Sequence, residues 1–173
     1  MARAIPGTQE LHYFEAASTN TVKCYATPYT YHAYYKNYLE DRGMTCFVER
    51  QLYPAKNKVA TFNYASRDNS GQIVTLYNQD YLLRSSPGYN VSNFVDFPHP
   101  NGAYSPFPVL YSKCGNCIIY NDLQLRYDTC VLVVVDPDNI DPCCLEMYDY
   151  LCGPTKILLY DKCNCADVYA TVQ

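Results

Sequence analysis

Hydrophobic and polar residues alternate with a period of two over many short stretches of this chain, and clusters of Gly, Pro, Asn and Asp separate the stretches. Alternate side chains of an extended strand point to opposite faces, so each such stretch predicts a strand. Residues 58–64 show the clearest alternation. We expect strands, or pieces of strands, at residues 21–35, 44–53, 58–64, 72–77, 81–83, 109–111, 117–120, 127–135 and 156–160.

The period changes to about 3.6 in two places, and each predicts a helix. Asp141 is suited to cap a helix that begins at Pro142, with Leu145, Tyr148, Leu151 and Cys152 on one face and Gly153 and Pro154 as a stop signal. Residues 9–17 predict a short N-terminal helix. One late helix after many strands indicates a mainly β protein, with a small barrel and a C-terminal helix packed on its wall.

Residues 85–108 depart from both patterns because they contain five prolines. We expect a long loop here, and long loops in compact domains are commonly functional. The loop also carries several aromatic residues, which would serve either as anchors for a partner or as a cover over the mouth of a barrel. These aromatic residues are Tyr89, Phe94, Phe97, Tyr104 and Phe107.

The cysteine content places the chain in an oxidising compartment. Ten cysteines in 173 residues are far more than cytosolic proteins usually contain, and the even number suits complete pairing. We therefore expect a secreted, extracellular protein that forms a single domain over residues 1–173. The first residues hold no apolar run long enough for a signal peptide, so we expect that one was removed and that Met1 is an added residue. The longest apolar run, residues 130–135, has the length of a strand and is too short to span a membrane.

Charge and motifs exclude several classes of function. The net charge is −4 and no basic cluster exceeds two residues, which argues against nucleic-acid binding. The three histidines, His12, His32 and His99, stand in no catalytic motif, and we expect neither an enzyme nor a cofactor. Asp136, Asp138 and Asp141 lack the Glu of a calcium loop, so we expect no metal site there.

Two further compositional features leave alternatives open. Twenty tyrosines suit either a half-exposed barrel surface or a site that meets a partner or ligand. The pair Cys114 and Cys117, together with Cys163 and Cys165, has the spacing of a zinc or redox site. Because Cys117 precedes a predicted strand and not a helix, and because the compartment is oxidising, we favour disulfides.

The order of elements and the position of the cysteines resemble the tick salivary lipocalins, the family of the histamine-binding proteins. The resemblance covers about two-thirds of the chain, and the paired cysteines within the late helix are its most specific part. The segments that carry it are residues 45–48, 117–120, 127–135, 142–148, 151–152 and 162–163. It implies a lipocalin-type barrel of eight antiparallel strands.

The resemblance also implies a disulfide pattern. In that family the cysteine of the second strand joins one near the C-terminus, and the cysteine that opens the penultimate strand joins the late helix. Carried over, this implies Cys46–Cys163 and Cys117–Cys144. Relatives further imply Cys24–Cys143 and Cys130–Cys152, which leaves Cys114 with Cys165, although spacing by itself does not define connectivity.

Members of the family bind different targets, which are amines, lipids or host complement proteins. Amine-binding relatives carry an acidic residue after the cysteine of the penultimate strand and an acidic-aromatic motif in the long strand. This chain has Ile118 and residues 130–133 (CVLV) at those places and contains no Trp. We therefore favour the two remaining functions over amine scavenging.

The first of these is inhibition of a host complement protein, such as properdin or the fifth component, through surface loops in tick saliva. The expected partner-binding residues lie in the proline-rich segment and are Tyr89, Phe94, Asp96, Phe97, His99, Tyr104 and Phe107. The second is sequestration of a sterol or eicosanoid inside the barrel, under the same aromatic rings. We expect a monomer, and Asn90 begins a glycosylation sequon in this segment.

Overall fold

The computed structural model describes residues 21–40, 45–99, 101–123, 125–126 and 128–173. The helix expected at residues 9–17 and His12 lie outside the described residues. The described strands are β1 (Thr30–Lys36), β2 (Thr45–Gln51), β3 (Val59–Arg67), β4 (Ile73–Arg84), β5 (Phe94–Pro98), β6 (Tyr104–Lys113), β7 (Cys117–Asn121), β8 (Cys130–Val134) and β9 (Ile157–Leu158). The described helices are α2 (Thr21–Cys24), α3 (Pro142–Cys152) and α4 (Ala166–Ala170).

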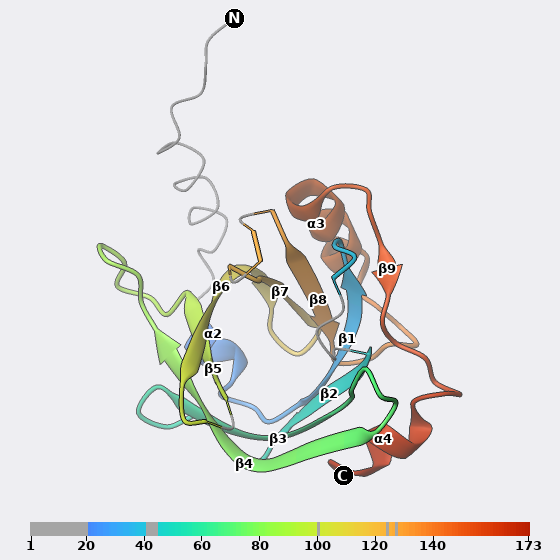
Figure 1. Cartoon of the computed structure of the whole chain (residues 1–173). Coiled ribbons are helices and arrows are strands. Elements are labelled where there is room, and N and C mark those ends of the chain that lie inside the picture. Colours follow the sequence, from blue (N-terminus) through green and yellow to red (C-terminus); the bar gives the residue numbers. More distant parts are fainter. Residues whose placement is uncertain (1–20, 41–44, 100, 124, 127) are drawn as a thin grey trace, which may run out of the picture.

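Strands β1 to β8 form a closed antiparallel barrel. Each strand pairs with its neighbours in the chain. Because β1 pairs with both β8 and β2, the sheet closes on itself. Figure 1 shows the ring of strands, with α3, β9 and α4 outside it. The short β9 lies against β1 on the outside, where Tyr35 pairs with Leu158. The expected eight-stranded barrel is therefore confirmed.

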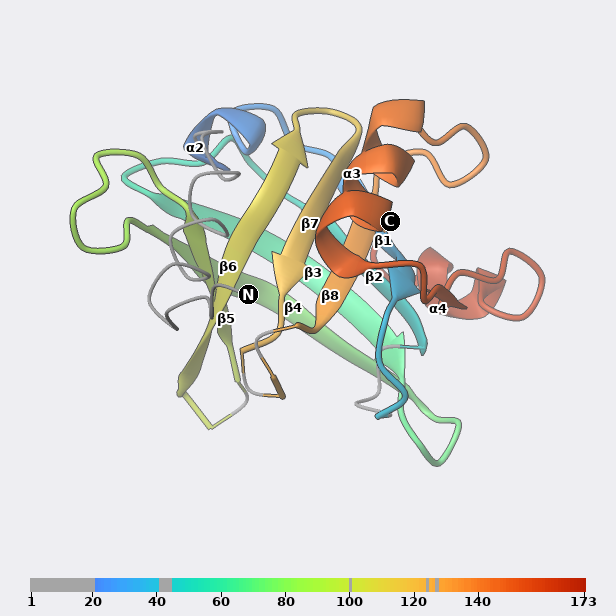
Figure 2. The same ribbon diagram turned by 90° about the horizontal axis from the view of Figure 1, so that it is seen from above.

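The two most apolar strands, β7 and β8, are buried on both of their faces. Ile118 and Val133 face the interior of the barrel, where they join its main hydrophobic core. Ile119 and Leu132 face outward and pack against the buried Tyr148 of α3. Figure 2 shows α3 outside the barrel, in front of β8. Double-sided burial explains why these strands read as continuous apolar runs and not as alternating ones.

Helix α3 begins and ends where its local signals predict. Asp141 caps its N-terminus, because Oδ1 of this residue accepts a hydrogen bond from the backbone N–H of Cys143 at 2.9 Å. Pro142 takes the first helical position, where no backbone N–H is required. Gly153 ends the helix with a positive φ of 79°, and its N–H bonds to the carbonyl of Asp149.

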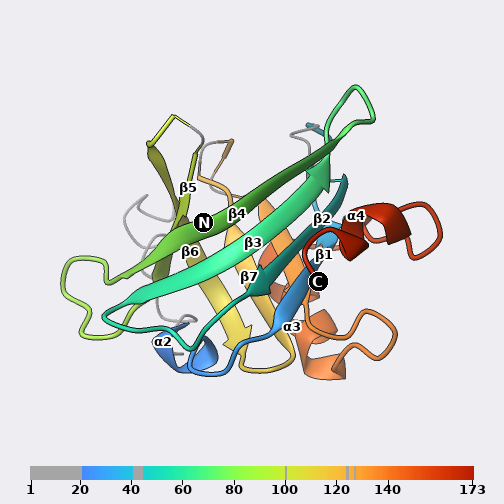
Figure 3. The same ribbon diagram turned by 90° about the horizontal axis from the view of Figure 1, so that it is seen from below.

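Helix α4 covers the outer face of β2 and β3. Val168 of α4 is fully buried with Val48 of β2 and Ala65 of β3. Figure 3 shows α4 beside these two strands. With only five residues this helix carries too few positions for a helical period to be visible, and the sequence did not predict it.

The prediction of a long loop at residues 85–108 is wrong. Most of the segment is an antiparallel hairpin of β5 and β6, in which Val95 pairs with Phe107 and Phe97 with Ser105. The prolines are tolerated because β6 pairs with β7 only from Val109 onward. The N–H of Val109 bonds to the carbonyl of Asn93, the residue before β5. The backbone nitrogens of Pro106 and Pro108, which carry no hydrogen, therefore point to the side of β6 that has no partner strand.

Two other strand predictions also need correction. The pieces at residues 72–77 and 81–83 form one twelve-residue strand, β4, with a break in register around Asn78, whose φ is 53°. A local bulge of this kind interrupts the alternation, so the strand reads as two. Residues 21–24 belong to α2 and not to a strand.

Four disulfides join the described elements, and two agree with the pairing that the resemblance implied. Cys117–Cys144 and Cys130–Cys152 fix α3 to β7 and β8. The other two are Cys24–Cys114 and Cys46–Cys165. Cys143 and Cys163 are free and exposed. The implied pairs Cys46–Cys163, Cys24–Cys143 and Cys114–Cys165 are therefore corrected.

The direction of each side chain explains these corrections. Cys165 is buried at the start of α4, where it faces Cys46, whereas Cys163 lies on the exposed turn two residues earlier. Cys144 faces β7, and its neighbour Cys143 points to solvent. Three of the four sulfurs that had the spacing of a zinc site are thus used in disulfides.

The disulfides are consistent with a secreted protein. Within the described part of the chain, no helix has the length and hydropathy that a membrane span requires. The same residues hold no cluster of three or more His, Cys, Asp or Glu that would suit a metal ion.

The disulfide pattern is tested by peptide mapping of the unreduced protein. We expect a crosslinked peptide that contains Cys46 and Cys165, and alkylation of Cys143 and Cys163 without reduction. Replacement of Cys46 and Cys165 by Ser lowers the free energy of unfolding by about 2–5 kcal/mol, because the bridge closes a long loop. Replacement of Cys143 and Cys163 by Ser leaves it within about 0.5 kcal/mol. A crosslinked peptide joining Cys46 to Cys163 would contradict the pattern.

Candidate ligand-binding cavity

The interior of the barrel contains a cavity of about 420 Å³. Its lining comes from β2, β3 and β4 on one side and from β5 to β8 on the other. The aromatic lining residues are Phe47, Tyr64, Tyr81, Phe97, Phe107 and Tyr120, and the aliphatic ones are Val74, Leu76, Pro98, Val131 and Val133. The polar ones are Glu49, Ser66, Asp68, His99 and Asp122.

Aromatic rings form a connected wall along one side of the cavity. The ring of Tyr81 stacks on Phe62 with centroids 4.4 Å apart and lies 4.5 Å from Phe97. Phe97 in turn meets Phe107 edge to face at 4.7 Å and Tyr120 at 5.5 Å. Rings in these arrangements hold one another in place, so the wall is largely formed before a ligand enters.

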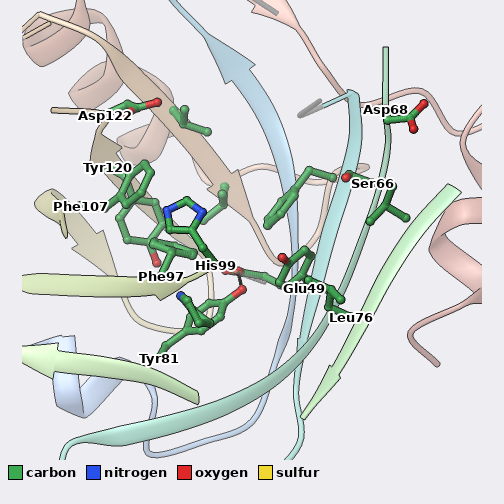
Figure 4. Close-up of a pocket in the computed structure, with 16 residues that line it drawn as sticks. Glu49, Ser66, Asp68, Leu76, Tyr81, Phe97, His99, Phe107, Tyr120 and Asp122 are labelled. Atoms are coloured by element: carbon green, nitrogen blue, oxygen red, sulfur yellow. Dashed lines mark hydrogen bonds between the residues drawn. The ribbon is translucent and has the colours of Figure 1, made fainter. Parts of the chain in front are cut away.

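Glu49 is the unusual residue of the cavity. It lies on β2, where Phe47 and Glu49 point inward, while Cys46 and Val48 face α4 on the outside. The side chain of Glu49 has no exposed surface. Tyr81 donates a hydrogen bond to Oε2 of Glu49 at 2.9 Å, whereas Oε1 has no partner among the described residues. Figure 4 shows this carboxyl next to Tyr81.

Burial controls the protonation of Glu49. It raises the pKa of this carboxyl to about 8, and the hydrogen bond from Tyr81 opposes the shift only in part. Burial also raises the pKa of the five surrounding tyrosines, and the nearby carboxyl raises each of them further; these residues are Tyr25, Tyr31, Tyr64, Tyr81 and Tyr120. Near neutral pH the inner cavity is therefore uncharged, with a carboxylic acid and several phenols on its walls.

One end of the barrel is closed beneath this group. Tyr25 follows α2 and shares a short hydrogen bond with the hydroxyl of Tyr120. Gln51 donates from Nε2 to the carbonyl of Tyr25 at 2.7 Å, and the Cys24–Cys114 disulfide fixes α2 to the turn after β6. In Figures 2 and 3, α2 lies at the end of the barrel away from the β3–β4 hairpin.

The opposite end of the cavity carries acidic groups. Asp68 stands at the β3–β4 turn, where Ser70 and the backbone of Gln72 hydrogen-bond its carboxylate and lower its pKa. Asp122 follows β7 and is buried. His99, at the end of β5, shares a short hydrogen bond with Ser105. No Lys or Arg occurs among the lining residues that the structure describes.

The structure distributes the expected partner-binding residues over both sides of the β5–β6 hairpin. Phe97, His99 and Phe107 line the cavity, and the rings of Phe97 and Phe107 are in contact. Asp96 is buried and accepts a hydrogen bond from Nη2 of Arg84 at 2.7 Å. Of the remainder, Tyr104 is 44% exposed and Tyr89 and Phe94 are half-buried, and Asn90 of the sequon is exposed in the β4–β5 connection.

Sequence reasoning missed Glu49, although a signal was present. In residues 45–51 the inward positions are Phe47, Glu49 and Gln51, and a charged residue in register with an inward Phe is the mark of a cavity carboxyl. The resemblance placed the acidic residues of amine-binding relatives on the penultimate strand and the long strand instead. The corresponding positions of this chain hold Ile118, Val131 and Val133, which are apolar and face the interior of the barrel.

Comparison with solved structures identifies the fold. No protein-family model matches this chain, and no curated protein matches its sequence. Apocrustacyanin C2 is similar in structure, with a TM-score of 0.60 at 12% identity over 95% of this chain and 90% of that chain. Apocrustacyanin C1 gives 0.56 at 10% identity, and lobster apocrustacyanin A1 gives 0.55 at 11%, each over 94% of this chain and 91% of the other.

Crustacyanins are lipocalins. This chain has a lipocalin-type fold. At 10–12% identity the likeness concerns the fold alone, and it agrees with the barrel that the resemblance implied. The cavity inside such a barrel is a place where proteins of this architecture hold one small ligand.

The protonation of Glu49 predicts a distinctive pH dependence of stability. Because the folded-state pKa of about 8 lies above the ordinary 4.5, the stabilising effect is complete below about pH 4.5 and is lost as the pH rises through 8. A Glu49→Gln variant does not titrate here. We expect the unfolding free energy of the variant, relative to the natural protein, to increase by about 4 kcal/mol between pH 4.5 and pH 8, measured by urea unfolding. A difference that stays constant with pH would contradict the assignment.

Proposed function

We propose that this protein captures one small, mainly apolar ligand that carries a positive charge, and that it holds this ligand in the barrel cavity. The observation that supports the proposal most strongly is Glu49, a buried carboxyl at the wall of an aromatic cavity, because its Oε1 has no hydrogen-bond partner among the described residues. A buried polar atom without a partner is costly, and a ligand that supplies the missing hydrogen bond removes this cost.

The size of the cavity supports a small ligand. Its volume of about 420 Å³ lies in the range of roughly 300–1,000 Å³ that is typical of small-molecule sites. Such a space accommodates a bicyclic aromatic body with a short side chain. The connected rings around Phe97 offer apolar contact to the body of the ligand.

The charges around the cavity favour a cation over an anion. Apart from its tyrosines, its titratable groups are Glu49, Asp68, Asp122 and His99, and the described lining contains no basic Lys or Arg. A carboxylate ligand such as an eicosanoid would have no counter-charge there. An ammonium group would meet Glu49 and the faces of aromatic rings, both of which stabilise a desolvated cation.

This proposal changes the order of the functions expected from the sequence. The absence of acidic residues at position 118 and in the long strand argued against an amine ligand, and both places are indeed apolar. The structure supplies a carboxyl from β2 instead, at Glu49. The structural neighbours are named apocrustacyanins, a term for proteins without their bound group, and this supports a carrier role for the fold.

The ligand class is tested with three indoles that share one ring system and differ in charge. Tryptamine is a cation, tryptophol is neutral and indole-3-acetate is an anion. Because the protein contains no Trp, indole fluorescence reports only the ligand. We expect tryptamine to bind at pH 8 at least tenfold more tightly than indole-3-acetate. Equal or tighter binding of indole-3-acetate would contradict the charge argument.

The location of the site is tested by a matched pair of substitutions on β4. Leu76→Trp places a large side chain in the cavity, and we expect at least a tenfold loss of tryptamine affinity in calorimetry. Tyr77→Trp changes the next residue, which points outward and is 55% exposed, and leaves the affinity unchanged. Equal effects of the two substitutions would place the ligand elsewhere.

A second candidate function is the one that the resemblance favoured, namely a tick salivary protein that binds a host complement component through its surface. Tyr104 supports it, because this residue is 44% exposed on β6 and its partner Pro98 lies beside it on β5. The inward direction of Phe97 and Phe107 leaves a smaller aromatic surface than that hypothesis assumes.

The complement hypothesis predicts that the protein reduces lysis of sensitised red cells in serum at sub-micromolar concentration. Tyr104→Ala would weaken this inhibition without a change in melting temperature, because the residue makes few core contacts. Unchanged lysis in both the classical and the alternative pathway would remove this candidate and leave the cavity ligand.

A further inference from the structure

Resting on the proposed function, we propose that the barrel exchanges a proton for its ligand, so that entry of the cationic group displaces the proton held by the Glu49 carboxyl. Ligand capture would then depend on the pH of the surrounding fluid. Glu49 is enclosed by the protein, phenol groups face it, and the described lining of the cavity holds no Lys or Arg as a counter-charge.

The first step is the state of the empty cavity. Glu49 has no exposed surface and receives one hydrogen bond from Tyr81, and no group in the described part of the chain bonds to its Oε1. A carboxylate enclosed in this way, with one donor and no cation, is much less stable than the neutral acid. Burial accordingly raises the pKa of Glu49 to about 8, so the acid form predominates at neutral pH.

The groups that face Glu49 do not supply a charge. They are the tyrosines that surround it from each packed element, namely Tyr25 after α2, Tyr31 on β1, Tyr64 on β3, Tyr81 on β4 and Tyr120 on β7. The hydroxyls of Tyr25 and Tyr120 bond to each other, and that of Tyr31 has no partner among the described residues. Elsewhere around the cavity stand His99, Asp68 and Asp122.

The second step is the exchange itself. When an ammonium group reaches Oε1, the O–H bond of the Glu49 acid breaks and its proton passes to the solvent buffer. The ammonium keeps its own proton and donates a hydrogen bond to the new carboxylate. One positive charge enters the cavity and one leaves, so the buried region stays neutral and the pair replaces the acid.

Entry also requires a small adjustment of the wall. Because Glu49 has no accessible surface in the empty barrel, a ligand group reaches it only when a neighbouring ring moves aside. Phe47 and Tyr64 are only half-buried, and their ring centroids lie 5.7 Å apart beside the cavity. These rings have the freedom to move that the fully buried Tyr81 lacks.

The experiment is titration calorimetry with tryptamine at pH 6.5 in two buffers that differ in their enthalpy of ionisation. We expect release of about one proton for each ligand bound, and a tryptamine affinity that rises about tenfold for each pH unit between 6 and 7.5. Tryptophol, which brings no charge, releases no proton. Proton release below about 0.2 per tryptamine, with an affinity independent of pH, would overturn the proposal.

Variants assign the proton to one residue. Glu49→Gln abolishes the proton release and the pH dependence, whereas Glu146→Gln, a matched change on the exposed surface of α3, keeps both. Tyr81→Phe removes the only hydrogen bond that the described residues give to the carboxylate, and it shifts the affinity profile to higher pH. Proton release that persists in Glu49→Gln would assign the exchange to another group and contradict the proposal.

The failure of this inference differs from the failure of the proposed function. If no indole binds between pH 6 and pH 9, the function proposed for the cavity is wrong, and the exchange fails with it. If tryptamine binds with equal affinity at pH 6 and pH 8, the cavity binds cations but the exchange is wrong. If tryptophol binds more tightly than tryptamine and weakens above pH 8, Glu49 acts as a neutral hydrogen-bond donor, and the exchange is again wrong.

Discussion

Pairing of β1 with both β2 and β8 closes the sheet, and the enclosed space that defines this molecule exists only because of that closure. In a closed barrel every second side chain points inward, whatever its polarity. Most inward positions here are apolar or aromatic and form the core. Glu49 is a fully buried acidic exception, because the register that directs Phe47 inward directs Glu49 inward as well. The fold thus imposes burial on a carboxyl, and burial determines its chemistry.

The outer shell stabilises the barrel without occupying its interior. Helix α3 covers β7 and β8 and is attached by two disulfides, and α4 covers β2 and is attached by the Cys46–Cys165 bridge. The fourth bridge, Cys24–Cys114, closes one end. Crosslinks that restrict the unfolded chain offset part of the cost of an interior that is not completely filled. Such a distribution leaves the cavity available for a ligand.

Local signals in the sequence predicted the elements whose causes are local. The cap at Asp141, Pro142 and the stop at Gly153 defined α3 correctly, and the alternation in residues 58–64 identified β3. The part of the β5–β6 hairpin at residues 94–108 was misread as a loop. Prolines are permitted there because β6 has no partner on one side, a fact that only the sheet order reveals. Cys163 is exposed on a turn and Cys165, two residues later, is buried. The sequence does not show this difference, so it did not distinguish the two as partners of Cys46.

The candidate site was predicted only in part. Phe97 and Phe107 were expected either as outward anchors or as a cover for the barrel, and they line the cavity. Glu49 was not identified, because its importance depends on strand parity and on contacts with Tyr81, which lies 32 residues away in the chain. The properties of this carboxyl come from residues that are distant from it in the sequence and close to it only in the fold.

The central claim is that Glu49 is a neutral acid in the empty barrel. The direct measurement is the carbon-13 chemical shift of its carboxyl, followed by NMR as the pH is raised. The account predicts a midpoint near 8 in the empty protein, and a carboxylate that is already ionised at pH 6.5 when tryptamine saturates the cavity. A midpoint near the ordinary value of 4.5 in the empty protein would contradict it.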